Sequence, residues 1–321
     1  MKQTSFYHPS QNFDHQAIQL YVEQFTHNQI YRSFCDLLHQ HPDDCQSLVK
    51  IPFLPISFFK THRVLTTSPQ CSFTFNSSGT GGKTSTHFVA DINIYEQSFT
   101  RCFEMFYGHP NKFAIIGLLP GYLEKPNSSL VYMMQKLIEM SACADSGFYL
   151  QNYEKLHHVL KRREKNGKQT FLLGVSFALL DFSEQFPSSL QHTIVVETGG
   201  MKGRRKEVVR EELHAQLKQN FKQSNIQSEY GMTELLSQAY AKTNGRFQCP
   251  PWMKVFVRHP NNPMDVRESG TGCLNIIDLA NKHSCAFIGT DDLGKVYPDG
   301  TFEVIGRVDS SDVRGCNLML R

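Results

Sequence analysis

The sequence predicts an α/β fold in which helices cover a largely parallel sheet and a β-rich subdomain follows. The first observation is that apolar runs alternate with amphipathic segments; these runs span residues 113–117, 170–174 and 192–196. Runs this uniformly apolar are typical of strands buried on both faces, and such strands form parallel sheets between helical layers. The second observation is a change to shorter strands and turns beyond residue 234.

The helical segments lie around and between these runs. Amphipathic patterns predict helices near 129–140 and 177–186, and a charged helix at about 206–218. Residues 1–50 also read as helical, and we expect them to pack against or cover the remainder of the chain. In the β-rich part, the turn residues at 298–300 predict a hairpin that joins the strands on either side.

These patterns predict three parts. They are a helical N-terminal segment (1–50), a core domain (51–305) and a short C-terminal tail (306–321). A chain of 321 residues is long enough to bury a large core. The core domain is therefore expected to carry the functional site.

Composition and charge exclude several classes of protein. Hydrophobic residues at 40% and charged residues at 20% are ordinary for a soluble globular protein. A net charge of +3 provides no strong basic field for nucleic acid or an anionic membrane. No apolar run approaches the roughly 20 residues that span a bilayer. Because the N-terminus also lacks a hydrophobic signal core, we expect a cytoplasmic protein.

The cysteine pattern argues against a disulfide framework and against a structural zinc site. The nine cysteines are an odd number, with no C-x-x-C pair and no histidine at metal-ligand spacing. Cys316 differs from the others because it lies near the end of the chain, where a flexible tail can carry it to a partner.

The most informative segment is the Ser/Thr/Gly-rich loop at 75–84, which follows a hydrophobic run. Glycines let such a loop curl without side-chain clashes, so that backbone amides and hydroxyls donate to anionic oxygens. The segment therefore indicates nucleotide handling, with an ordinary solvated loop as the alternative. It is not a Walker A loop, because Ser78 stands where the leading glycine of that motif belongs. A P-loop kinase or GTPase is disfavoured.

Other unusual polar segments fall at the ends of predicted strands. Residues 197–200 follow one apolar run, and residues 230–234 follow a short run at 226–229. Ligands of open α/β sheets bind at the carboxyl ends of strands. These segments and the glycine-rich loop are therefore expected to form one shared site.

Four of these segments, in order, resemble the core motifs of the adenylate-forming superfamily of acyl-CoA synthetases, luciferases and adenylation domains. They are residues 77–83 (SSGTGGK), 230–234 (YGMTE), 290–294 (TDDLG) and 306–309 (GRVD). Three further segments look like the LuxE-type acyl-protein synthetases of bacterial luminescence systems. They are residues 51–60, 197–204 and 314–318. The resemblance covers roughly residue 50 to the C-terminus.

The resemblance implies the N-terminal domain fold of these enzymes, with layered sheets, flanking helices and a β-rich subdomain. It also implies activation of a carboxylic acid by ATP and Mg²⁺ to an acyl-adenylate, followed by acyl transfer to a thiol. A long-chain fatty acid is the substrate that it favours. An acyl-reductase, an acyltransferase or a carrier protein is the expected kind of partner, and the oligomeric state is not predicted.

The residue types suit the phosphate chemistry of that reaction. The loop can donate to phosphate oxygens from the hydroxyls of Ser77, Ser78 and Thr80 and from the amides of Gly79, Gly81 and Gly82. Lys83 can meet a β- or γ-phosphate oxygen as a point charge. Thr233 can donate to the α-phosphate, and Glu234 can hold Mg²⁺, which prefers carboxylate oxygens.

The remaining assignments concern the nucleoside. Tyr230 offers an aromatic face to adenine beside Gly231, and Gly199 and Gly200 let the backbone approach the base. Asp292 suits both ribose hydroxyls, with Arg307 as a second ribose or phosphate contact. Each residue alone also fits a structural role: a core aromatic, a helix N-terminal carboxylate, a turn residue and a surface ion pair. Since Asp291 stands where the superfamily usually has glycine, either aspartate can face the ribose, and we favour Asp292.

A departure from the superfamily concerns the C-terminus. Members commonly continue past the Gly-Arg-x-Asp hinge into a small domain that supplies a lysine, and here that domain is essentially missing, because the sequence ends at Arg321. Adenylation is then expected to rely on the glycine-rich loop, Mg²⁺ and Arg307, or on a partner subunit. The resemblance implies that the acyl group is held on a cysteine near the C-terminus. Cys316 is the candidate, with Arg314 able to lower its pKa; a tail cysteine without a role is the alternative.

The functional hypothesis is an acyl-protein synthetase that makes acyl-AMP and then a thioester on Cys316. One alternative is an acyl- or aryl-CoA ligase similar to the phenylacetate-CoA ligases, in which coenzyme A takes the acyl group. The other is an inactive scaffold that keeps the fold.

Overall fold

The computed structural model describes residues 6–66, 71–77, 84–121, 127–150, 152–199 and 209–308. It divides the chain into two compact units. One unit, here called the parallel-sheet unit, comprises Cys71–Pro250. The other, the antiparallel-sheet unit, combines Met1–Gln70 with Pro251–Arg321. The expected domain boundaries near residues 50 and 305 stay predictions.

The parallel-sheet unit contains a six-stranded sheet with strand order β5-β4-β6-β7-β8-β9. Its strands are β4 (Ala114–Leu118), β5 (Gly147–Phe148), β6 (Thr170–Val175), β7 (Thr193–Thr198), β8 (Gln227–Tyr230) and β9 (Ala239–Ala241). All neighbouring strands pair in parallel except β8 and β9. The prediction of a largely parallel sheet is confirmed. It follows from residues such as those of β4 and β6, every one of which is buried.

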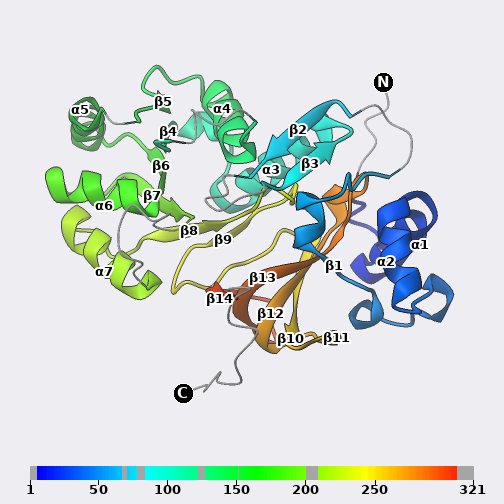
Figure 1. Cartoon of the computed structure of the whole chain (residues 1–321). Coiled ribbons are helices and arrows are strands. Elements are labelled where there is room, and N and C mark those ends of the chain that lie inside the picture. The colour runs from blue at the N-terminus through cyan, green and yellow to red at the C-terminus, as the bar shows by residue number, and fades with distance from the viewer. Residues whose placement is uncertain are drawn as a thin grey trace. The chain divides into compact units, whose positions relative to one another are not determined.

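The helices of this unit pack on the sheet through aromatic side chains. They are α3 (Ile92–Tyr107), α4 (Ser129–Ser141), α5 (Tyr153–Lys165), α6 (Ser176–Gln185) and α7 (Arg210–Phe221). Phe103 and Tyr107 of α3 contact Phe171 of β6, with ring centroids 5.0 and 4.9 Å apart. Phe182 of α6 contacts Phe221 of α7, and Figure 1 shows these two helices side by side. A two-stranded hairpin of β2 (Phe73–Asn76) and β3 (Thr86–Val89) completes the unit.

The antiparallel-sheet unit is built on a six-stranded sheet with the path β1-β13-β12-β10-β11, in which β14 also pairs with β13. Its strands are β1 (Leu54–Pro55), β10 (Met253–His259), β11 (Asn262–Arg267), β12 (Gly270–Asp278), β13 (Phe287–Val296) and β14 (Phe302–Arg307). The predicted hairpin is confirmed, since β13 and β14 pair antiparallel across the turn at 298–300. The predicted β-rich subdomain is therefore present.

Helices α1 (Phe13–His27) and α2 (Gln29–Leu37) belong to the same unit as these strands. Tyr21 of α1 and Tyr31 of α2 both contact Phe287 of β13, with ring centroids 6.0 and 5.7 Å apart. The expectation that the N-terminal helices pack against the remainder of the chain is confirmed, and the strands they cover lie more than two hundred residues away in sequence.

The side chain of Gln24 in α1 forms hydrogen bonds with the backbone of the segment that connects β12 and β13. Its Nε2 donates to the backbone oxygens of Asn281 and Lys282, each at 3.0 Å, and its Oε1 accepts from the Ala286 amide at 2.9 Å. Gln24 is fully buried, as are Asn281 and Ala286, so these hydrogen bonds form inside the protein. One glutamine thus satisfies three main-chain groups.

Substituting Gln24→Ala is expected to lower the free energy of unfolding by about 2–4 kcal/mol, because it removes three hydrogen bonds and takes from the buried Ala286 amide its side-chain partner. Urea unfolding followed by circular dichroism measures the change. Glu23→Ala, at an exposed position of the same helix, serves as the matched control. Equal effects of the two substitutions would contradict the assignment.

Candidate functional site

Three adjacent strands of the parallel sheet bring their carboxyl ends together. Val175 of β6 is paired with Thr198 of β7, and Thr198 is paired with Glu229 of β8. Ser176, Gly199 and the residues up to 234 follow these strands directly, so they lie at one edge of the sheet, where the sequence predicted segments 197–200 and 230–234. The Ser176 hydroxyl donates to the backbone oxygen of Gly199 at 2.9 Å. Gly199 has a φ of +71°, a conformation that favours glycine.

Glu197 is a buried carboxylate at this edge with several compensating partners. Arg210 is the first residue of α7, and its Nε lies 3.3 Å from Glu197 Oε1. Nε2 of His214 lies 3.6 Å from the same oxygen. Ser176 Oγ lies 3.2 Å from Oε2, so its one proton can serve either this oxygen or the Gly199 oxygen. Burial favours a raised pKa for Glu197, but the His214 hydrogen bond and the Arg210 charge outweigh it and lower the pKa. Glu197 is therefore ionised at neutral pH.

Glu229 is a second buried carboxyl group, one strand away. The hydroxyl of Thr198 donates to its Oε2. Burial raises the pKa of Glu229 to about 7, the Thr198 hydrogen bond opposes this rise, and the negative charge of Glu197 adds to it. The pKa values of two carboxyl groups on neighbouring strands are therefore shifted in opposite directions.

The turn after β8 carries the predicted phosphate and metal residues. Thr233 is half-buried and Glu234 is buried, with 4% of its surface exposed. Tyr230 is 8% exposed, and its ring lies 5.8 Å from that of Phe247. The predicted contact of Tyr230 with adenine stays a prediction.

The β2–β3 hairpin is connected to that turn. His87 of β3 is fully buried, and its Nδ1 lies 2.8 Å from the backbone oxygen of Thr233. At the base of the glycine-rich loop, Ser77 Oγ accepts from the Ser85 amide at 2.9 Å, which leaves the hydroxyl proton able to donate. The base of this loop and the 230–234 turn are thus attached to one hairpin.

In the antiparallel-sheet unit, the predicted ribose residues lie on a bulge. Asn275 of β12 pairs with Gly289 of β13, and Cys273 pairs with Leu293, so three residues of β13 oppose Leu274 alone. Such bulges re-aim side chains. Thr290 stabilises the bulge: its Oγ1 donates to the Leu274 oxygen at 2.9 Å and accepts from the Asp292 amide at 3.1 Å.

The bulge joins the two residues assigned to the ribose. Asp292 is paired with Arg307 of β14, and Arg307 Nε donates to Asp292 Oδ1 at 3.0 Å. The Asp292 side chain is 8% exposed, whereas that of Arg307 is 72% exposed. Asp291 is exposed, and its backbone oxygen accepts from the Val308 amide at 2.8 Å. Of the two aspartates, Asp292 forms the ion pair with Arg307.

Several predicted residues lie outside the described part of the chain. They are Ser78, Gly79, Thr80, Gly81, Gly82, Lys83, Gly200 and Cys316. Their assigned roles stay predictions. Among the described residues, no group of three or more His, Cys, Asp and Glu side chains is arranged to hold a metal. Mg²⁺ needs fewer, since it commonly uses one or two carboxylates with waters and substrate phosphates.

The sequence analysis missed three residues that contact the predicted motifs: His87 and Glu229 in the parallel-sheet unit and Arg258 in the antiparallel-sheet unit. Arg258 of β10 donates from Nη2 to the backbone oxygen of Thr290 at 2.8 Å and so supports the bulge. His87 and Arg258 each contact a backbone oxygen of a predicted motif elsewhere in the chain, and Glu229 accepts a hydrogen bond from Thr198 on the neighbouring strand. For His87 and Arg258 the available signal was a polar residue among the apolar residues of its strand, whereas the run Gln227–Tyr230 around Glu229 is polar and gave none.

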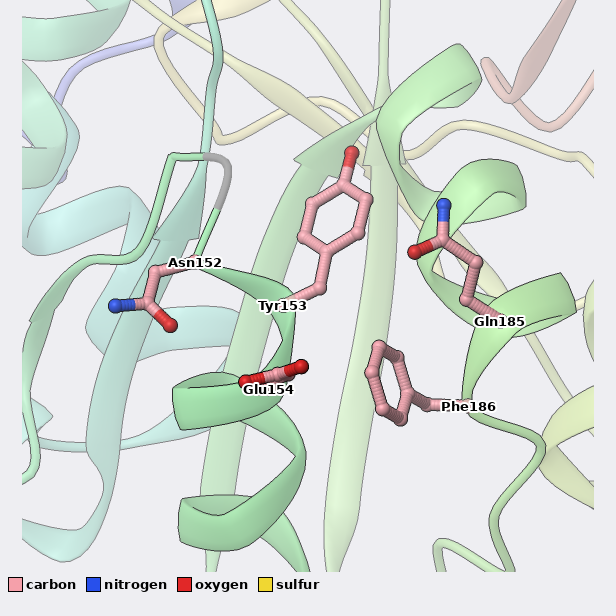
Figure 2. Close-up of a pocket in the computed structure, with 5 residues that line it drawn as sticks. All are labelled: Asn152, Tyr153, Glu154, Gln185 and Phe186. Carbon is pink, nitrogen blue, oxygen red and sulfur yellow. The ribbon is translucent and has the colours of Figure 1, made fainter.

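A pocket occurs elsewhere in the parallel-sheet unit, between the start of α5 and the end of α6. It is lined by Asn152, Tyr153, Glu154, Gln185 and Phe186, as Figure 2 shows. None of the predicted site residues lines it. No helix in the described ranges combines the length and apolar character needed to cross a membrane.

The family description "Acyl-protein synthetase, LuxE" matches residues 4–321. The chain belongs to this family. It is thus a ligase, and the predicted membership of the LuxE-type group is confirmed.

Two relatives carry the name long-chain-fatty-acid–luciferin-component ligase. The one from Aliivibrio fischeri is 25% identical over 324 residues, covering 92% of this chain and 84% of the relative. The one from Vibrio harveyi is 22% identical and covers 94% of this chain and 85% of the relative. Both similarities extend over most of this LuxE-family chain.

Solved structures confirm the predicted fold. A 2-hydroxyisobutyryl-CoA ligase in complex with 2-HIB-AMP and CoA superposes with a TM-score of 0.67 at 11% identity, covering 92% of this chain and 74% of that chain. ATP-bound MatB from Rhodopseudomonas palustris gives a TM-score of 0.56 at 13% identity, covering 73% of this chain and 47% of that chain. The LuxE-family chain therefore has the N-terminal domain fold of adenylate-forming enzymes.

Thr290→Val is expected to lower the free energy of unfolding by about 1–3 kcal/mol, because valine has the shape of threonine but neither donates to Leu274 nor accepts from Asp292. Thermal and urea unfolding measure the effect. Thr271→Val, at an exposed position of β12, is the control and is expected to be neutral. A neutral Thr290→Val variant would show that the bulge does not need these hydrogen bonds.

Proposed function

We propose that this LuxE-family ligase activates a long-chain fatty acid with ATP and Mg²⁺ and then transfers the acyl group to a thiol. In the first step a carboxylate oxygen bonds to the α-phosphorus of ATP, the bond to the bridging oxygen breaks, and pyrophosphate leaves. In the second step a thiolate sulfur bonds to the acyl carbon and AMP leaves. The names of the two curated relatives support the choice of a fatty acid.

One observation supports this proposal most directly: Thr233 and Glu234 follow β8 at the edge where Gly199 follows β7. Backbone and hydroxyl donors at such an edge suit phosphate oxygens, which gain charge as pyrophosphate leaves. The His87 contact to the Thr233 backbone oxygen limits the freedom of the turn before substrate arrives. The glycine-rich loop, with Lys83, is assigned to the β- and γ-phosphates.

Glu234 is the residue that would hold Mg²⁺. Its carboxylate fits a hard cation, and its burial favours a partner of opposite charge. When bound, Mg²⁺ neutralises phosphate charge and so favours departure of pyrophosphate. Asp292 is assigned to the ribose hydroxyls of the same nucleotide, with Arg307 oriented by its ion pair with Asp292.

Asp292→Asn is expected to raise the KM for ATP by about 10–100-fold, because a neutral amide loses both the charge-assisted bond to ribose and the ion pair with Arg307. Fatty-acid-dependent exchange of labelled pyrophosphate into ATP measures it. Asp265→Asn is the matched control, since Asp265 forms an exposed ion pair with Arg267 that is expected to matter little. Absence of exchange by the wild-type protein would reject the adenylation step itself.

The acyl acceptor is proposed to be Cys316. Incubation with labelled fatty acid, ATP and Mg²⁺ is expected to leave label on the protein that hydroxylamine removes. The label is expected to be lost in Cys316→Ser and retained in Cys45→Ser, a half-buried cysteine in the antiparallel-sheet unit. Label that appears only in acyl-CoA, when coenzyme A is supplied, would instead identify a CoA ligase.

A further inference from the structure

The carboxyl ends of β7 and β8 carry two buried acidic side chains with unequal surroundings. Glu197 and Glu229 are 4% and 6% exposed. The basic side chains near them in the described part of the chain, Arg210 and His214, are directed at Glu197. Among the described residues, the hydrogen-bond partner of Glu229 is the uncharged hydroxyl of Thr198. A buried carboxylate without a cation is costly, so the surroundings of Glu229 favour a neutral acid.

Among the residues that the structure describes, the other titratable groups around Glu229 add no positive charge. Tyr95 and Tyr107 of α3 and Tyr240 of β9 interact electrostatically with it, and burial raises the pKa of each tyrosine, so all three are neutral. Glu197 of β7 is the ionised neighbour. Ionisation of Glu229 would therefore place two negative charges on paired strands inside the protein.

The Glu229 side chain also touches both segments that follow these strands. Its Oε2 is bonded to Thr198, which directly precedes Gly199. Its Oε1 occupies the space beside Gly231, where an added Cβ would lie 2.5 Å from it. Glycine at 231 thus leaves room for this carboxyl group to fold back over the start of the 230–234 turn. One side chain links the end of β7 to the turn after β8.

We propose that Glu229 is a positioning residue that, as a neutral carboxylic acid, holds the Thr198–Gly199 segment and the Tyr230–Glu234 turn together for nucleotide binding. The proposal rests on the proposed adenylation reaction. It assigns to Glu229 no contact with substrate; the residue acts through the two segments that it joins. Above neutral pH, charge repulsion from Glu197 loosens this link.

The pH dependence has a defined sign. Burial raises the pKa of Glu229 to about 7, above the ordinary carboxyl value, so the folded protein retains a proton that the unfolded chain releases. The stability contributed by this proton is present at low pH and is lost as pH rises towards and through about 7. Relative to a variant with glutamine at this position, the wild-type protein becomes less stable over that range.

Three substitutions test the proposal. Glu229→Gln keeps the shape and the neutral state, Glu229→Ala removes the link, and Thr198→Val removes the hydroxyl while keeping the shape. Glu211→Gln, at an exposed position of α7, is the control. The KM for ATP and kcat are measured by fatty-acid-dependent pyrophosphate exchange across pH. Amide hydrogen exchange of residues 198–199 and 230–234 is measured on the same proteins.

At about pH 6, Glu229→Gln is expected to match the wild type, whereas Glu229→Ala and Thr198→Val raise the KM for ATP about 3–10-fold. As pH rises through about 7, the KM of the wild type rises and that of Glu229→Gln stays level. After correction for intrinsic rates, hydrogen exchange of the two segments accelerates in Glu229→Ala and, at high pH, in the wild type. Thr198→Val supplies the test if Glu229→Ala does not fold.

The proposal is overturned if Glu229→Gln is impaired as much as Glu229→Ala, or if the wild type and Glu229→Gln have the same pH profile. Hydrogen exchange separates this failure from a failure of the proposed function. A wild-type protein without exchange activity rejects adenylation. In that protein, unchanged protection of the two segments in Glu229→Ala would independently reject the link.

Discussion

The pairing of β7 with β8 is the constraint on which the site depends, because it buries two acidic side chains at the edge where ligands of α/β sheets bind. Glu197 forms an ion pair with Arg210 and lies near His214, both from α7, which attaches that helix to the strand end. Glu229 accepts a hydrogen bond from the Thr198 hydroxyl, and its burial favours the protonated form. Because burying charge is costly, each carboxyl group needs suitable neighbours. Glycine at 231 is one of them, since it leaves room for the carboxyl group of Glu229.

The two units prepare their functional residues by different backbone devices. In the parallel-sheet unit, side chains stand on turns that leave buried strands, and a left-handed glycine at 199 shapes one of these turns. In the antiparallel-sheet unit, a bulge in β13 turns Asp292 towards Arg307 on the neighbouring strand. The bulge interrupts the regular pairing of β13 with β12, and Arg258 of β10 supports it by donating to the Thr290 backbone oxygen.

Sequence patterns predicted most of the fold, since burial on both faces leaves an unmistakable apolar run at β4, β6 and β7. They also predicted which segments meet at the sheet edge, because parallel strands share one carboxyl end. The sequence patterns did not predict the roles of His87 and Arg258, which support the predicted motifs. The partner of His87 is a backbone oxygen 146 residues away, and that of Arg258 is one 32 residues away. A contact between a side chain and a distant backbone group has no local periodicity to reveal it.

The sequence by itself determined the layer architecture, the order of the motifs and the family, because periodicity and motif spacing are local properties of the chain. The tertiary structure alone decided that the pKa is lowered for Glu197 and raised for Glu229, which have the same side chain and lie on paired strands. It also decided that Asp292, and not Asp291, pairs with Arg307. Charge state and orientation depend on burial and on neighbours brought from elsewhere in the chain, and these exist only once the strands have paired.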